Sequence, residues 1–283
     1  MNDNEQDQSE LKSSVAPGLD LLVDEHEEEV SEGGRTVRRQ GVYLLPNLFT
    51  TGALFSGFYA IVASMNGNFE AAAMALFAAM VLDAADGRVA RLTRTESTFG
   101  AQYDSLSDMV AFGVAPALLV FAWSLQSLGQ VGWVATFIYM ACAALRLARF
   151  NMQDDHAVFV GLASPAAAAL LAGLVWTFTE NAPRSLGPDG LGAVALAFYT
   201  AVVGLLMVSP LRYWSPKTIR LAGRVPFFTL VAIVLAYAGV MLDPPRMLLG
   251  AVLIYAASGP VMFFMQRARR ARAAAEKKSS ETR

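Results

Sequence analysis

The chain has 283 residues, of which 55% are hydrophobic and only 16% charged, and its mean hydropathy is +0.41. This composition excludes an ordinary soluble domain of that length and predicts an integral membrane protein. The single cysteine, Cys142, excludes an intrachain disulfide and a thiolate metal cluster, and the isolated His26 and His156 exclude a histidine-based zinc site, so any catalysis must depend on carboxylates and basic side chains.

Residues 1–40 are predicted to form a disordered acidic tail. They hold 11 of the 24 acidic residues and have no sustained apolar period, so they cannot bury enough surface to offset the entropy of ordering. We expect no signal peptide, because the first long apolar run begins only after Pro46. Residues 41–266 are the expected membrane-embedded domain. Residues 267–283 form a basic tail that either extends the last helix along an anionic membrane surface or is a solvated helix.

Eight apolar runs lie between the tails, each of about twenty residues, which is the length that crosses about 30 Å of hydrocarbon. The sequence therefore predicts an all-α fold, a polytopic membrane helical bundle with about eight transmembrane helices. The expected spans are 46–66, 70–92, 99–125, 130–150, 162–181, 190–209, 225–242 and 245–265.

The distribution of cations predicts how the chain is oriented. If both termini are cytoplasmic, 20 of the 22 lysines and arginines lie on the cytoplasmic side, and only Arg184 and Arg246 lie outside. This bias follows the positive-inside rule and favours an even number of spans. We see no internal repeat, which argues against an inverted-repeat transporter.

Four aspartates lie at the predicted cytoplasmic ends of the second and third spans. At about 100° per residue, Asp83 and Asp86 share one face of their helix. The spacing of four residues places Gly100, Asp104 and Asp108 in one stripe on the next helix. Charged side chains near a bilayer interior are costly, so two antiparallel helices that direct four carboxylates at one point indicate a functional site.

Four anions this close would repel one another in a low dielectric unless a cation lies among them. Mg²⁺ or Mn²⁺ is the expected cation, because both ions prefer carboxylate oxygens and leave positions open for water or substrate phosphate. We expect one or two such ions.

Small and basic residues beside the aspartates indicate a nucleotide diphosphate site. Gly87, Ala90 and Gly100 leave one side of the site without bulk, and Arg91 offers a fork of donors to phosphate oxygens. The same small residues, taken singly, also suit close helix packing. Asn47 and Thr50 either hydrogen-bond the diphosphate or cap the start of the first span.

The pattern Asp83-x-x-Asp86-Gly87-x-x-Ala90-Arg91, then eight residues, then Gly100-x-x-x-Asp104-x-x-x-Asp108 resembles the signature of the CDP-alcohol phosphotransferase family at every signature position. The resemblance implies that the first three aspartates ligate a divalent metal and that Asp108 both contacts metal and acts as the general base. It also implies a homodimer.

Three further stretches resemble the membrane-embedded phosphatidylserine synthases of bacteria, a branch of this family. They are residues 45–58, 146–151 and 159–167, with Ala163 where a proline is expected. The implied reaction transfers the phosphatidyl group of CDP-diacylglycerol to the hydroxyl of L-serine and releases CMP, in the bacterial inner membrane with the active site cytoplasmic. We expect membrane lipid as a further partner and no nucleic acid.

The carboxylate of serine requires cationic partners near the metal site. The candidates are Arg146, Arg149, Arg212 and Lys217, although the positive-inside rule alone also places them on that side. We favour Arg146 and Arg149, because their spacing of three residues presents both on one helix face.

Three alternatives remain at this stage. A member of the same family with another acceptor (glycerol 3-phosphate, inositol phosphate or choline) would carry the same aspartate signature. A divalent-cation or proton-coupled transporter also uses intramembrane acids, although those acids are expected at the bilayer midplane. A catalytically silent scaffold is disfavoured, because four acids without a cation would destabilise it.

Overall fold

The structure is a computed structural model that describes residues 30–32, 35–37, 44–93, 98–152, 161–180, 187–211, 213 and 227–281. The chain divides into two compact units, residues 1–42 and 43–283. In the first unit, strands β1 (Val30–Glu32) and β2 (Arg35–Val37) pair antiparallel. The rest of the predicted disordered tail, and the predicted site residues Arg212 and Lys217, lie outside the described residues.

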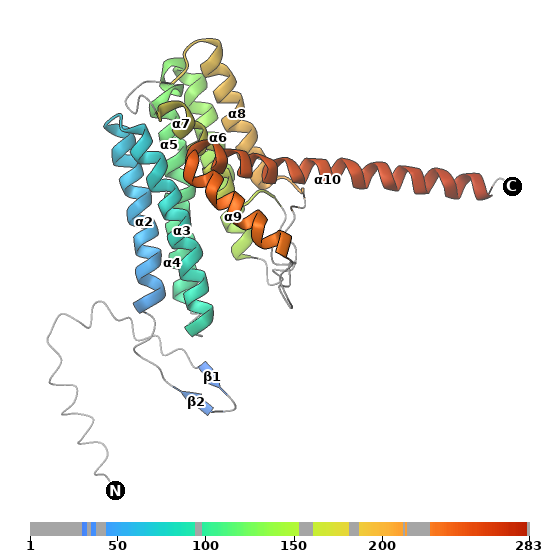
Figure 1. The fold of residues 1–283 in the computed structure, drawn as a ribbon, viewed down its shortest axis with the longest axis horizontal. Helices are drawn as coiled ribbons and strands as arrows, with labels where there is room; N and C mark the ends of the chain where they lie inside the picture. Colours follow the sequence, from blue (N-terminus) through green and yellow to red (C-terminus); the bar gives the residue numbers. More distant parts are fainter. Residues whose placement is uncertain are drawn as a thin grey trace, which may run out of the picture. The chain divides into compact units, whose positions relative to one another are not determined.

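Every regular element described in the second unit is a helix, which confirms the predicted all-α fold (Figure 1). Its irregular helices are a π-helix, η1 (Met109–Val114), and a 3-10 turn, η2 (Leu125–Leu128). The helices are α2 (Leu44–Met65), α3 (Phe69–Thr93), α4 (Thr98–Asp108), η1 (Met109–Val114), α5 (Ala115–Trp123), α6 (Gln130–Asn151), α7 (Ser164–Thr179), α8 (Leu191–Val208), α9 (Phe227–Leu242) and α10 (Pro244–Glu281).

Each of the eight predicted spans corresponds to a helix or, for the third, to the continuous series α4, η1 and α5. Within the described residues, five helical stretches are long and apolar enough to cross a membrane: Pro46–Met65, Phe99–Trp123, Gln130–Asn151, Leu191–Val208 and Pro244–Phe263. Helices α3 and α7 are not among them. Helix α7 is apolar but has only 16 residues, and α3 carries two aspartates. The protein is an integral membrane protein, and the number of eight crossings stays a prediction.

Small residues allow the helices to pack closely, as is usual in membrane bundles. A Cβ added at Gly57 of α2 would lie 2.7 Å from the Cα of Ala111 in η1. A Cβ added at Gly204 of α8 would lie 2.8 Å from the Cα of Tyr139 in α6. Glycine at both positions therefore brings the backbones of these helix pairs into direct contact.

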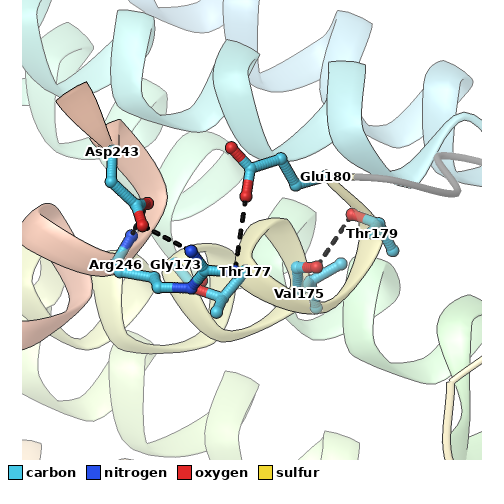
Figure 2. Close-up of polar contacts among 7 residues, drawn as sticks. All are labelled: Gly173, Val175, Thr177, Thr179, Glu180, Asp243 and Arg246. Carbon is cyan, nitrogen blue, oxygen red and sulfur yellow. Dashed lines mark hydrogen bonds and ion pairs between the residues drawn. The ribbon is translucent and has the colours of Figure 1, made fainter. Parts of the chain in front are cut away.

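The end of the bundle away from the aspartates is joined by ionic contacts around Arg246 (Figure 2). Arg246 lies in the first turn of α10. Its Nη1 is 2.5 Å from Asp243 Oδ2, and its Nη2 is 3.8 Å from Oε2 of Glu180, which follows α7. Because α3 ends and α4 begins at the opposite end, this contact is structural and separate from the aspartate site.

Candidate active site

Three of the four predicted aspartates come together between α3 and α4. One carboxylate oxygen each from Asp83, Asp104 and Asp108 lies within 4.8 Å of the others. Asp83 lies in α3, and the four-residue spacing in α4 places Asp104 and Asp108 one turn apart on the face towards it. All three side chains are half-buried, so they are partly shielded from water but still open to a ligand.

The fourth aspartate, Asp86, is held by a residue of another helix. The Thr50 hydroxyl of α2 donates a hydrogen bond of 2.8 Å to Asp86 Oδ2. Both residues are buried, with 4% and 5% of their surface exposed. Asp86 stays within electrostatic range of Asp83 and Asp104. Thr50 thus fixes the direction in which the Asp86 carboxylate points.

Two further hydrogen bonds connect α2 to α4 around this site. The buried Ser107 hydroxyl donates to the backbone carbonyl of Thr50 over 3.1 Å. The hydroxyls of Thr51 and Tyr103 lie 2.9 Å apart. The buried Ser107 bond therefore aligns α4, which carries Asp104 and Asp108, with α2, whereas the Thr51 contact lies at the exposed surface.

The predicted nucleotide-site residues surround the aspartates on α2, α3 and α4. Gly87 and Arg91 are exposed, and a Cβ at Gly87 would meet only the Arg91 guanidinium, at 3.9 Å. The Nε of Arg91 donates to the carbonyl of Gly87, and this bond does not engage the two terminal nitrogens of the exposed guanidinium. Ala90, Gly100 and Asn47 are half-buried.

The π-helix η1 begins at Met109, directly after Asp108. Such helices are rare, and they occur frequently at functional sites. Its carbonyl at Phe112 accepts a hydrogen bond of 2.9 Å from the hydroxyl of Tyr139 in α6, and both residues are fully buried. Tyr139 therefore supports the irregular turn that follows Asp108.

The candidate serine-binding cations differ in their surroundings. Arg149 is exposed, whereas Arg146 is half-buried and donates through Nη1 to the Ser164 hydroxyl at 2.7 Å. Arg146 also lies within electrostatic range of Asp108. The spacing of three residues thus gives the two arginines different environments, and only Arg146 is directed into the bundle.

Sequence reasoning missed the residues that support the site from neighbouring helices. Ser107, Tyr103, Tyr139 and Ser164 make the hydrogen bonds described above. Ser107 could have been found, because it lies directly before Asp108 within the aspartate signature. The partners of the others belong to separate helices, and no local pattern indicates them.

Comparison with known proteins identifies the family. The sequence pattern of the CDP-alcohol phosphatidyltransferase family matches residues 43–207, which include all four aspartates and Arg146. The chain belongs to this family. This match confirms the family membership that the aspartate signature predicted.

Several relatives in this family carry the name CDP-diacylglycerol–serine O-phosphatidyltransferase. The Helicobacter pylori (strain 26695) protein is 35% identical over 218 residues, covering 76% of this chain and 90% of the relative. The Bacillus subtilis protein is 31% identical over 170 residues, covering 60% and 89%. The Mycobacterium tuberculosis (strain H37Rv) protein is 41% identical over 152 residues, covering 50% and 53%.

The CDP-alcohol phosphatidyltransferase family depends on metal, and the acid cluster fits a metal ion. Asp83, Asp104 and Asp108 offer only carboxylate oxygens, the ligands that hard divalent ions prefer. Their oxygens lie within 4.8 Å of one another, so these three side chains could hold a metal ion together.

Proposed function

We propose that this protein transfers the phosphatidyl group of CDP-diacylglycerol to the hydroxyl of L-serine and releases CMP. The observation that carries the proposal is the convergence of Asp83, Asp104 and Asp108 within 4.8 Å. It supplies the site that phosphoryl transfer in this family requires. The acceptor is taken from relatives that are named for serine, including one that this chain covers over 90% of its length.

The metal is Mg²⁺ or Mn²⁺, as one or two ions held by Asp83, Asp86, Asp104 and Asp108. When bound, it neutralises charge on the diphosphate and on the departing CMP. Asp83, Asp104 and Asp108 would ligate it directly, and Thr50 would hold Asp86 in the direction of the cluster. Removal of divalent ions with EDTA should abolish CMP release, and adding either ion back should restore it.

Asp108 is the general base of the proposed reaction. It takes the proton of the serine hydroxyl while that oxygen attacks the phosphorus that bears the lipid. A new phosphorus–oxygen bond forms to serine, and the bond between this phosphorus and the oxygen of CMP breaks. Asp108 is half-buried at the end of α4, beside the metal ligands, as this role requires.

The remaining residues of the α2–α4 face hold the nucleotide. Gly87, Ala90 and Gly100 leave space for CDP, and the terminal nitrogens of Arg91 are available to phosphate oxygens. Asn47 and Thr50 lie in the first turns of α2, at the same end of the bundle as the aspartates. Thr50 acts through Asp86, because its hydroxyl is engaged with that carboxylate.

The proposed topology places the site on the cytoplasmic side of a bacterial inner membrane. The cation distribution supports it, with 20 of 22 lysines and arginines on the side of the aspartates if both termini are cytoplasmic. Soluble serine then enters from water while the acyl chains of the donor remain in the leaflet. We also propose the domain division 1–40, 41–266 and 267–283, and a homodimer in lipid.

The decisive experiment measures CMP release by purified protein with CDP-diacylglycerol, Mg²⁺ or Mn²⁺, and one of four acceptors. L-serine should support release, and glycerol 3-phosphate, inositol phosphate and choline should not. Release with another acceptor alone would show a different member of the family. If Asp108→Asn left CMP release intact and abolished ion uptake into vesicles, the protein would be a transporter.

A further inference from the structure

A group of polar side chains lies beside the aspartates, and part of it falls outside the family match. Arg146 of α6 lies within electrostatic range of both Asp108 and Tyr255 of α10. The ring of Tyr255 packs against that of Tyr213, with centroids 5.6 Å apart. Both tyrosines follow residue 207, where the match to the family pattern ends. We call Arg146, Ser164, Tyr213 and Tyr255 the Arg146 cluster.

The backbone brings Tyr213 to this place through the segment after α8. The amide of Leu162 donates to the carbonyl of Leu206, and the amide of Gly161 donates to the carbonyl of Leu211. These bonds hold the segment after α8 against the start of α7, where Ser164 binds Arg146. Gly161 has φ of +88°, which a residue with a side chain rarely adopts.

Two polar atoms of the cluster are buried without a partner. Among the residues that the structure describes, three buried side-chain atoms have no hydrogen-bond partner, and two of them are Arg146 Nε and Tyr213 Oη. Tyr213 is only 6% exposed. The described part of the chain gives Arg146 no ion pair within 4.0 Å, since both ion pairs there belong to Arg246.

Such an arrangement is costly for a folded protein unless a ligand completes it. The Nε of a guanidinium and the hydroxyl of a phenol are both hydrogen-bond donors, and a buried donor without an acceptor destabilises the fold. Packing cannot be the reason for the Tyr213 hydroxyl, because phenylalanine would fill the same space. An incoming anion with two oxygens would accept from both donors.

We propose that the Arg146 cluster binds the carboxylate of the acceptor, with Tyr213 and Tyr255 as residues that determine acceptor specificity. The inference rests on the proposed function, because it assigns to the acceptor serine a place beside Asp108. Arg146 Nε and Tyr213 Oη donate to the carboxylate. Ser164 holds the other arm of the guanidinium, and Tyr255 positions the Tyr213 ring. Bound there, serine has its hydroxyl directed to Asp108.

In this proposal, the CDP donor and the acceptor are recognised by residues from different parts of the chain. The aspartates that serve the shared CDP donor are inside the family match, and Tyr213 and Tyr255 are outside it. Acceptor choice would then be set by α10, which packs onto α7, and by the segment after α8, which bonds to the backbone of Gly161 and Leu162 just before α7.

The test compares acceptors and variants by steady-state CMP release. The acceptors are L-serine and serinol, in which a hydroxymethyl group replaces the carboxylate. Tyr213→Phe should raise the KM for L-serine about tenfold, with kcat and the KM for CDP-diacylglycerol within about twofold. Its melting temperature should not fall, since the hydroxyl has no partner to lose. Tyr237→Phe, an exposed tyrosine of α9, is the matched control.

Arg146→Gln should remove the preference of the wild-type protein for L-serine over serinol, a loss of about a hundredfold. Arg146→Lys should recover only part of it, because lysine has no planar fork. An unchanged serine KM in Tyr213→Phe would overturn the role of Tyr213. An unchanged preference in a folded Arg146→Gln protein would overturn the whole cluster as a carboxylate site.

The outcomes also separate this inference from the proposed function. If the wild-type protein releases CMP with glycerol 3-phosphate and not with L-serine, the proposed function is wrong. The same variants measured with glycerol 3-phosphate then decide whether the cluster binds an anionic acceptor. If only choline supports release, both proposals are overturned, since choline carries no anionic group.

Discussion

Replacing Thr50 by valine should weaken the metal site without touching a metal ligand in the acid cluster. Valine has nearly the same shape as threonine, so the helix packing of α2 is retained and only the hydroxyl is lost. That hydroxyl is the buried donor of the 2.8 Å hydrogen bond to Asp86. Without it, the carboxylate of Asp86 keeps only its contact with the backbone amide of Gly87 and can rotate away from the cluster.

The expected magnitude follows from the kind of bond that is lost. A hydrogen bond to a charged group contributes about 1.5–3 kcal/mol, and each 1.4 kcal/mol is about a factor of ten. Groups that orient metal ligands typically change metal affinity or activity by about 10- to 100-fold. We therefore expect Thr50→Val to raise the Mg²⁺ concentration for half-maximal CMP release by about 10- to 100-fold.

The assay is a Mg²⁺ titration of CMP release at saturating substrates, with Thr50→Ser and Thr51→Val beside it. Thr50→Ser keeps the hydroxyl and should behave like the wild type. Thr51→Val removes an exposed hydroxyl that contacts Tyr103 and should leave the titration nearly unchanged. If Thr50→Val titrates like Thr51→Val, or if Thr50→Ser is as impaired as Thr50→Val, the argument that Thr50 orients Asp86 is wrong.

Three further predictions concern the helix packing near the site and the ionic contact at the opposite end of the bundle, with Gly250→Ala as a control. Gly57→Ala should destabilise the protein by about 1–3 kcal/mol, because its Cβ would lie 2.7 Å from backbone of η1, whereas Gly250→Ala, with nothing within 4 Å, should keep the wild-type melting temperature. Tyr139→Phe should lower both the melting temperature and kcat, because a buried carbonyl of η1 loses its donor at a cost of about 1–3 kcal/mol. Arg246→Gln should cost no more than about 1 kcal/mol and leave CMP release unchanged, since its side chain is 60% exposed; a large loss of activity would contradict the separation of the two ends.

The helices and the acid cluster could be predicted from the sequence, because both depend on the spacing of residues that are close together in the chain. Apolar runs of about twenty residues gave ranges close to the observed helices, as for α6, predicted at 130–150 and observed at Gln130–Asn151. The four-residue spacing of Asp104 and Asp108 likewise set their common face before any packing was known.

The contacts between helices could not be predicted in this way. Thr50 was placed at a phosphate or a helix cap, yet its hydroxyl binds Asp86, a residue 36 positions later. Arg146 and Arg149 were expected to act together, yet only Arg146 faces Ser164. Such pairings depend on how α2, α6 and α7 are placed against α3, and a single sequence does not specify that placement.

The π-helix has a consequence for how this segment tolerates insertions and deletions. Each extra residue in a helix rotates all that follows by about 100°. With η1 between them, α4 directs Asp104 and Asp108 to the site while α5 directs Trp123 to the core, although one regular helix would give the two halves a different relative phase. Shortening η1 by one residue would force a choice between the acid cluster and the buried face of α5. Residues 109–114 thus set the rotation of α5 relative to α4. Their number matters more for this than their amino-acid types.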